Sequence, residues 1–217
     1  MNMLKYIILF LPVLLFADNK KMHDEDPKNR PHNTLGFGVL GSVYINDDQI
    51  FIGQTGSTLN NGSIFIYSKS DDGKIDKDQI FPPIVGTVEH DFGFSISVDG
   101  NSMVVGAPSR AGNGVGRAFI YQRKASREWV LKKEIVPDSS TWTTDFGSKV
   151  VIEDNLILIG DRYARNEDGM VYALYFNKNL GNWIKINSIW TDQIVSHGLF
   201  GHDIDIYQNR AIIGSRD

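Results

Sequence analysis

The sequence predicts an all-β fold in which one antiparallel sheet recurs along the chain. From residue 35 onward, short apolar segments alternate with polar turns, and no stretch shows a sustained helical period. The pair Phe92-Gly93 returns as Phe146-Gly147 and again as Phe200-Gly201, each time after 54 residues. A pattern that returns at a fixed distance marks a repeated structural unit. The period therefore defines the architecture before any single residue is interpreted.

Further markers keep the same period. In each copy one glycine closes the second predicted strand, another opens the third, and a tyrosine lies at the end of the third. These markers are Gly53, Gly106, Gly160 and Gly214, then Gly62, Gly116 and Gly169, and finally Tyr67, Tyr121 and Tyr175. Phe37-Gly38 precedes the series, but Phe37 lies 16 residues before Gly53, whereas the other phenylalanines lie 14 residues before their glycines. Either two residues are inserted in the first copy, or Val39-Leu40 takes the Phe-Gly place.

Each complete copy is expected to contain four strands. The first two form a hairpin through turns rich in Asp, Asn and Gly, which tolerate positive φ. The expected hairpins pair residues 43–45 with 50–52, 95–98 with 103–105, 150–152 with 157–159, and 203–206 with 211–213. Third strands are expected at 63–67, 118–121 and 171–175, and more polar fourth strands at 74–80, 129–135 and 183–189. This gradient predicts a buried inner edge and a solvent-exposed outer edge.

Four strands in a repeat of about fifty residues are typical of a β-propeller blade. The arrangement resembles the FG-GAP repeats of integrin α-subunit propellers and, more closely, the plain FG-GAP repeats of secreted bacterial and protist proteins. The second copy has the whole signature, from Phe92-Gly93 through Gly106-Ala107-Pro108 to Gly116 and Tyr121. The resemblance covers residues 35–217 and implies the fold. It implies little about activity, because propellers host many unrelated functions.

The copies are expected at residues 35–90, 91–144, 145–198 and 199–217, which amounts to an incomplete ring of about 3.5 blades. The fourth copy reaches only its second strand. Two explanations remain open. The chain is a fragment or truncated product with an unprotected edge strand, or it assembles with another chain that supplies further blades.

The N-terminal residues predict export. Residues 1–17 combine one lysine, an apolar run and a small residue, which is typical of a secretory signal peptide. An uncleaved N-terminal anchor is the alternative. Residues 18–34 are too polar to bury a core, and we expect a disordered leader there. The mature chain is then extracellular or periplasmic, with no stable membrane span.

Composition and motifs argue against several classes of function. A net charge of −4 gives no basic face for nucleic acid, and the absence of cysteine excludes disulfides, thiolate metal sites and cysteine nucleophiles. None of the four turns has the acidic spacing of a calcium loop, and Asp203-Ile204-Asp205 comes closest. No histidine is accompanied by a serine in a nucleophile elbow. We therefore expect no cofactor, no metal site and no catalytic residue.

The predicted function is non-catalytic binding of a protein or a glycan, as in cell adhesion. Loops 55–61, 109–115 and 162–168 are expected to form a recognition surface on a rigid scaffold. Trp129 and Trp183 share a repeat position, which favours packing over an exposed platform that would also include Trp190. Trp142 breaks the period and is the aromatic residue expected to touch a ligand. The alternative is a scaffold for a secreted hydrolase whose catalytic domain lies outside this chain.

Overall fold

The computed structural model describes residues 40–46, 48–55, 62–69, 74–80, 91–109, 114–137, 145–190, 198–208 and 210–216. All of them belong to one compact unit, residues 38–217. The expected signal peptide and leader lie outside the described residues, as do Phe37, Gly38 and Trp142. Most of loops 55–61 and 109–115 lies outside them as well, whereas loop 162–168 is described throughout.

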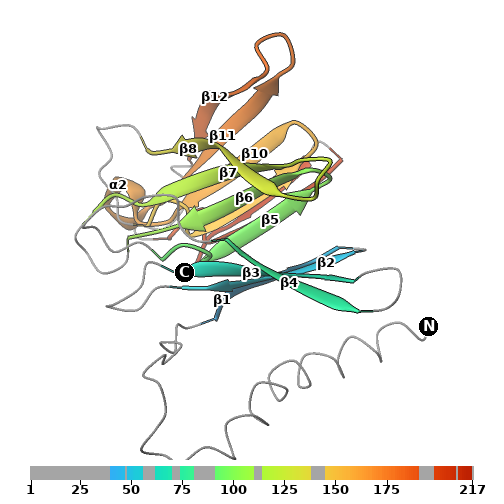
Figure 1. Cartoon of the computed structure of the whole chain (residues 1–217). Coiled ribbons are helices and arrows are strands. Elements are labelled where there is room, and N and C mark those ends of the chain that lie inside the picture. The colour runs from blue at the N-terminus through green and yellow to red at the C-terminus, as the bar shows by residue number, and fades with distance from the viewer. Residues whose placement is uncertain are drawn as a thin grey trace, which may run out of the picture. The chain divides into compact units, whose positions relative to one another are not determined.

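The described residues form antiparallel sheets in which each strand pairs with its neighbours in sequence (Figure 1). The first sheet contains β1 (Leu40–Ile45), β2 (Gln49–Gln54), β3 (Ser63–Lys69) and β4 (Ile75–Ile80). The second contains β5 (Ser95–Asp99), β6 (Ser102–Ala107), β7 (Arg117–Arg123) and β8 (Trp129–Ile135). The third contains β9 (Lys149–Glu153), β10 (Leu156–Asp161), β11 (Met170–Asn177) and β12 (Asn182–Ile189), with the short α2 (Ala164–Glu167) between β10 and β11. The fourth consists of β13 (Asp203–Tyr207) and β14 (Arg210–Gly214). The predicted all-β class and the repeated sheet are confirmed.

Burial changes across the second and third sheets as the sequence predicts. The first sheet differs, because Val43 and Ile45 of its inner strand β1 are exposed. In β6 and β10 every residue after the first is buried, because these strands lie between neighbours within the sheet and are covered on their faces. In the outermost strands β8 and β12, most residues are exposed or only partly buried. Trp129 and Trp183 are the buried exceptions in these outer strands, at 8% and 6% exposure. This confirms that their role is packing.

Successive sheets share hydrophobic clusters. Phe51, Ile64 and Ile66 of the first sheet pack with Ile96 and Val98 of the second. The same arrangement joins the second sheet to the third and the third to the fourth. The residues involved are Val104, Ala118 and Ile120 with Val150 and Ile152, and then Leu158, Val171 and Ala173 with Ile204 and Ile206. The core is therefore a series of equivalent interfaces between neighbouring sheets.

The repeat signature forms the backbone junction within these interfaces. A Cβ atom added to Gly106 would lie 1.9 Å from the carbonyl oxygen of Gly147 in the next sheet. A Cβ added to Gly53 would also lie 1.9 Å from the carbonyl oxygen of Gly93, and one added to Gly160 would lie 2.4 Å from that of Gly201. Gly62 and Gly169 form parallel bridges with Phe92 and Phe200, and a Cβ on Gly116 would lie 2.2 Å from the carbonyl oxygen of Phe146. Glycine is required here because the two backbones approach too closely for any side chain.

Two registers differ from the simple 54-residue count. Tyr67 and Tyr121 lie opposite Ile50 and Met103, but the equivalent residue opposite Ile157 is Leu174. Tyr175 is therefore shifted by one position, which turns its side chain to the other face and leaves it 43% exposed. In the first sheet, a β-bulge between Leu40 and Ser42 accommodates the irregular spacing of that copy.

Gly214 differs from the other glycines that close a second strand. It accepts a hydrogen bond from the amide of Gly201, just as Gly106 and Gly160 accept bonds from Gly93 and Gly147. However, the nearest atom to a Cβ on Gly214 is the carbonyl oxygen of Asp203 in its own sheet, at 3.6 Å. Within the described residues, Gly214 therefore keeps the contact inside its sheet and makes no junction to a following one.

Candidate functional site

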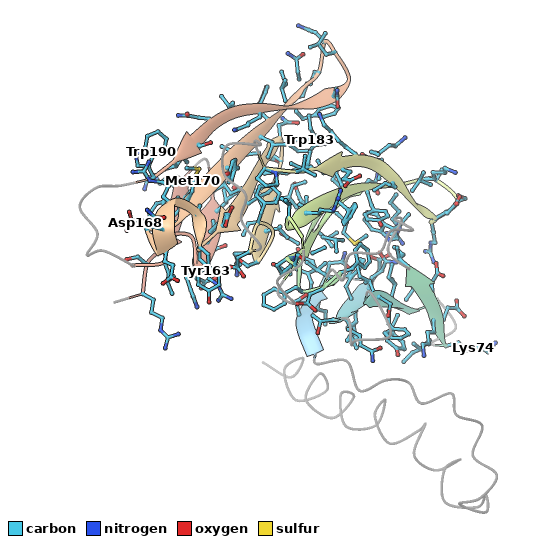
Figure 2. The ribbon with its side chains drawn as sticks, turned by 90° about the vertical axis from the view of Figure 1, so that its left-hand side faces the viewer. Lys74, Tyr163, Asp168, Met170, Trp183 and Trp190 are labelled. Carbon is cyan, nitrogen blue, oxygen red and sulfur yellow. The ribbon has the colours of Figure 1, made fainter. Side chains whose placement is uncertain are left out.

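The loop between β10 and β11, residues 162–168, forms the best-defined candidate site. Figure 2 shows Tyr163 and Asp168 of this loop on the same side of the third sheet as Trp190, which follows β12. The loop contains α2, whose residues Arg165, Asn166 and Glu167 have φ values of 57°, 59° and 71°. These are left-handed values, and α2 is therefore a left-handed turn.

Such a turn is costly, because each left-handed non-glycine residue loses roughly 1–2 kcal/mol relative to the right-handed conformation. Backbone hydrogen bonds hold it in place. The amide of Gly169 donates to the carbonyl of Ala164 at 2.9 Å, and the amide of Leu199 donates to the carbonyl of Glu167 at 3.0 Å. Ala164 itself is fully buried. Strained backbone that is held by its surroundings occurs preferentially at functional sites.

A buried ion pair fixes the base of the loop. The Nε atom of Arg162 lies 2.6 Å from Oδ2 of Asp145, and the side chains are 15% and 1% exposed. Asp145 immediately precedes the Phe-Gly pair of the third sheet, so the ion pair connects the loop to the repeat junction. Removing one member of a buried pair costs about 3–5 kcal/mol, because the other charge is left uncompensated. The loop is therefore anchored at its start.

Beside this anchor lies a group of side chains that we call the aromatic–arginine patch, formed by Arg162, Tyr163, Arg165 and Trp190. Tyr163, Arg165 and Trp190 are exposed, whereas Arg162 is mostly buried in its ion pair with Asp145. Tyr163 is 41% exposed and Trp190 is 46% exposed. The guanidinium carbon of Arg162 lies 5.2 Å from the centre of the Tyr163 ring, and that of Arg165 lies 5.0 Å from the Trp190 ring. Guanidinium groups beside aromatic rings place positive charge next to apolar faces. Such a surface suits stacking against a sugar or contact with polar groups of a protein.

A second candidate site is a hollow of about 350 Å³, which is lined by Asp48, Asn101, Arg123, Lys124, Ala125 and Arg127. Two of its cationic side chains form ion pairs. Arg123 forms an ion pair with Asp48 at 3.2 Å, and Lys124 forms one with Glu128 at 2.9 Å. The hollow is wide and open, and we prefer the aromatic–arginine patch as the binding site.

The sequence-based expectations meet the structure unevenly. Of the three tryptophans in the alternative platform, Trp129 and Trp183 are buried and Trp190 is exposed, so no platform of three forms. Trp142 cannot be placed, because it lies outside the described residues. The sequence predicted that loop 162–168 is part of a binding surface. It did not predict that Arg162 lies against Tyr163 or that Arg165 lies against Trp190. Trp190 lies close to Arg165 because β11 and β12 return the chain to the same end of the sheet.

The described residues contain no group of three or more side chains that could hold a metal ion. Asp203 instead forms an ion pair with Lys149, with 2.6 Å between Nζ and Oδ1. The hydrogen bond from Lys149 holds the pKa of Asp203 below its ordinary value. Among the described residues, no helix has both the length and the apolar character that a bilayer crossing requires.

No protein-family model matches the chain, and no curated protein matches it either. The resemblance to FG-GAP repeats therefore depends on the repeat signature in the sequence.

Proposed function

We propose that the chain is an exported, non-catalytic binding protein of the FG-GAP type, whose sheets are blades of a β-propeller. Two features support this proposal. Four-stranded antiparallel sheets recur with the sequence period, and the Phe-Gly pairs and glycines of the signature meet at each junction between sheets. A rigid repeated scaffold that presents irregular loops is a common basis for recognition.

The observation that carries the binding proposal is the aromatic–arginine patch. Its backbone is preformed by the left-handed turn and the Arg162–Asp145 ion pair, so a ligand does not have to order the loop. Preorganisation of this kind improves affinity by lowering the entropic cost of binding. The partner is a protein or a glycan that presents polar groups beside an apolar face.

The experiment is to apply the fluorescently labelled chain to an array of glycans and to an array of secreted protein ectodomains. For any partner found, replacing Trp190 with alanine is expected to weaken binding at least about tenfold, since exposed aromatic residues dominate such interfaces. Tyr163→Ala should act in the same direction.

The matched control is Tyr207→Ala, which removes an exposed aromatic side chain from β13 rather than from the patch. Its affinity should equal that of the wild-type chain. Equal binding by Trp190→Ala and the wild-type chain would rule out the patch as the site. Absence of binding on both arrays by a correctly folded chain would contradict the proposed function.

A further inference from the structure

The first strand and the last strand of the described sheets each expose a face that is buried in the other sheets. The sheet registers define equivalent positions. Val43 and Ile45 of β1 lie opposite Ile52 and Ile50. The residues that take their places in β5, β9 and β13 are Ile96 and Val98, Val150 and Ile152, and Ile204 and Ile206.

These equivalent residues are all buried except in β1. The six residues of β5, β9 and β13 are between 1% and 8% exposed, because each packs against the preceding sheet. Val43 is 51% exposed and Ile45 is 47% exposed. We call Val43 and Ile45 the β1 face.

The opposite half of the interface is exposed at β14. Ile212 lies opposite Asp205 and takes the place of Phe51, Val104 and Leu158 in the preceding sheets. Those three residues are at most 2% exposed, whereas Ile212 is 78% exposed. We call Ile212, with Asp203 and Asp205 of the neighbouring strand, the β14 face.

The two faces match each other, because the same two positions meet at every interface between sheets in the chain. Phe51 shares a cluster with Ile96 and Val98. The next two interfaces repeat this, with Val104 beside Val150 and Ile152, and Leu158 beside Ile204 and Ile206. Ile212 and the pair Val43 and Ile45 are therefore the two separated halves of one recurring interface.

The interface between the second and third sheets also has polar contacts at equivalent positions. The hydroxyl oxygens of Ser95 and Ser97 accept hydrogen bonds from the amides of Val150 and Ile152, at 3.0 and 3.1 Å. Asp203 and Asp205 take the places of the two serines in β13. Both residues are exposed. The Oδ1 atom of each accepts a hydrogen bond from the amide of the following residue, and that of Asp203 is also paired with Lys149, so Oδ2 is the acceptor that each presents. A carboxylate is a stronger acceptor of an amide hydrogen than a hydroxyl is. The β14 face therefore presents an apolar side chain and acceptors where the β1 face presents apolar side chains and amides.

We propose that a second copy of the chain packs its β1 face onto the β14 face of the first, so that copies associate head to tail. The contact uses two different surfaces, and each added copy therefore brings a further free face. Such a heterologous interface closes into a ring or extends, depending on the rotation between copies. This inference does not depend on the aromatic–arginine patch.

The first test measures molar mass by light scattering from about 1 to 100 µM on the whole 217-residue chain. The wild-type chain is expected to form dimers or larger species as its concentration rises. Ile45→Lys and Ile212→Lys should each weaken this association at least about tenfold, because a lysine would be buried in the interface. The control Ile186→Lys changes a 61% exposed isoleucine on β12 and should behave as the wild-type chain does.

The second test uses the absence of cysteine from the chain. Ile45→Cys and Ile212→Cys are prepared separately and mixed under mild oxidation. The mixture should give a disulfide-linked pair, whereas either variant alone should not, because a head-to-tail contact brings the two different positions together. Replacing Ile45→Cys in the mixture with Leu180→Cys, at the exposed β11–β12 turn, should abolish the product.

A wild-type chain that stays monomeric over this range, together with a mixture that does not cross-link although both thiols react with a soluble reagent, would overturn the proposal. The two faces would then be left for a different partner. Association that survives both lysine substitutions would overturn it equally. Circular dichroism on each variant shows whether a loss of association reflects the interface or a loss of fold.

Discussion

At the scale of single residues, the glycines of the repeat are required for a different reason from glycines in turns. Gly106 is placed so that any Cβ would overlap the carbonyl of Gly147, and neither backbone can move without opening the interface. Gly181, in the β11–β12 turn, has a φ of 60° but no atom within 4 Å of an added Cβ. We expect Gly106→Ala to cost about 3 kcal/mol or more and Gly181→Ala only about 1 kcal/mol.

Urea denaturation of the two variants measures this difference. Equal losses of unfolding free energy would show that conformational freedom, rather than the close approach of backbones, explains the glycine at the junction.

Tyr121 has a buried hydroxyl group that makes no hydrogen bond within the described residues. Burial raises the pKa of its hydroxyl well above the ordinary value, and no hydrogen-bond partner for that hydroxyl lies among the described residues. A buried polar group without a partner is destabilising, so Tyr121→Phe is expected to raise the free energy of unfolding by about 1 kcal/mol. Tyr44→Phe is the matched control, because the Tyr44 hydroxyl donates to the carbonyl of Val98. It should lower stability by about 1 kcal/mol, and a loss of stability in both variants would contradict the assignment for Tyr121.

The ion pair between Lys149 and Asp203 predicts a dependence of stability on pH. The hydrogen bond and the charge of Lys149 lower the pKa of Asp203 in the folded chain. A group with a depressed folded pKa contributes stability above its unfolded pKa and loses it as the pH falls through the folded pKa. The stability difference between the wild-type chain and Asp203→Asn should therefore be present near neutral pH and disappear below the ordinary range of aspartate. Because the pair is partly exposed, we expect the difference to be small, and a difference that grows with acid would contradict its origin in Asp203.

At the scale of elements, side chains of one inner strand bind the backbone of the next. The hydroxyl of Ser97 on β5 accepts from the amide of Ile152 on β9. Ser97→Ala leaves that buried amide without its acceptor, and we expect a loss of about 1–3 kcal/mol in urea denaturation. Ser102→Ala is the control, since the Ser102 hydroxyl makes only a long bond of 3.5 Å to Gln122. A similar effect of both substitutions would show that the hydrogen bond between Ser97 and the amide of Ile152 does not account for the loss of stability.

The strands and the position of loop 162–168 could be predicted from the sequence, whereas the conformation of that loop could not. Apolar alternation and turn residues predict each hairpin because they report local structure directly. The turn at Arg165, Asn166 and Glu167 has no such signal, because only Asn commonly adopts left-handed φ values. The 54-residue period also failed to predict the register of β11, in which Leu174 rather than Tyr175 lies opposite Ile157. Counting from Gly169 instead of from Tyr121 leads to Leu174, because the glycine spacing between these copies is 53 residues rather than 54.

At the scale of the whole molecule, the sequence predicts the repeated sheet but not a closed arrangement of sheets. The period describes one unit and its contact with the next, and that contact is found at each of the described interfaces. Whether the series closes depends on the angle between successive sheets, which no residue pattern specifies. The β1 and β14 faces are exposed because, among the described residues, neither has the neighbouring sheet that covers its equivalents.

The exposed face of β14 predicts an uneven distribution of stability along the chain. The second and third sheets contribute residues to clusters on both of their faces. Among the described residues, β13 and β14 are covered by the third sheet alone. Segments with few buried apolar contacts open at lower free energy. Hydrogen exchange in dilute solution should therefore protect the amides of β6 and β10 most and those of β14 least. At concentrations where copies associate, protection of β13 and β14 should rise while that of β6 stays constant. Uniform exchange over all the sheets would show instead that the chain opens as one cooperative unit and that β14 is held as firmly as the central strands.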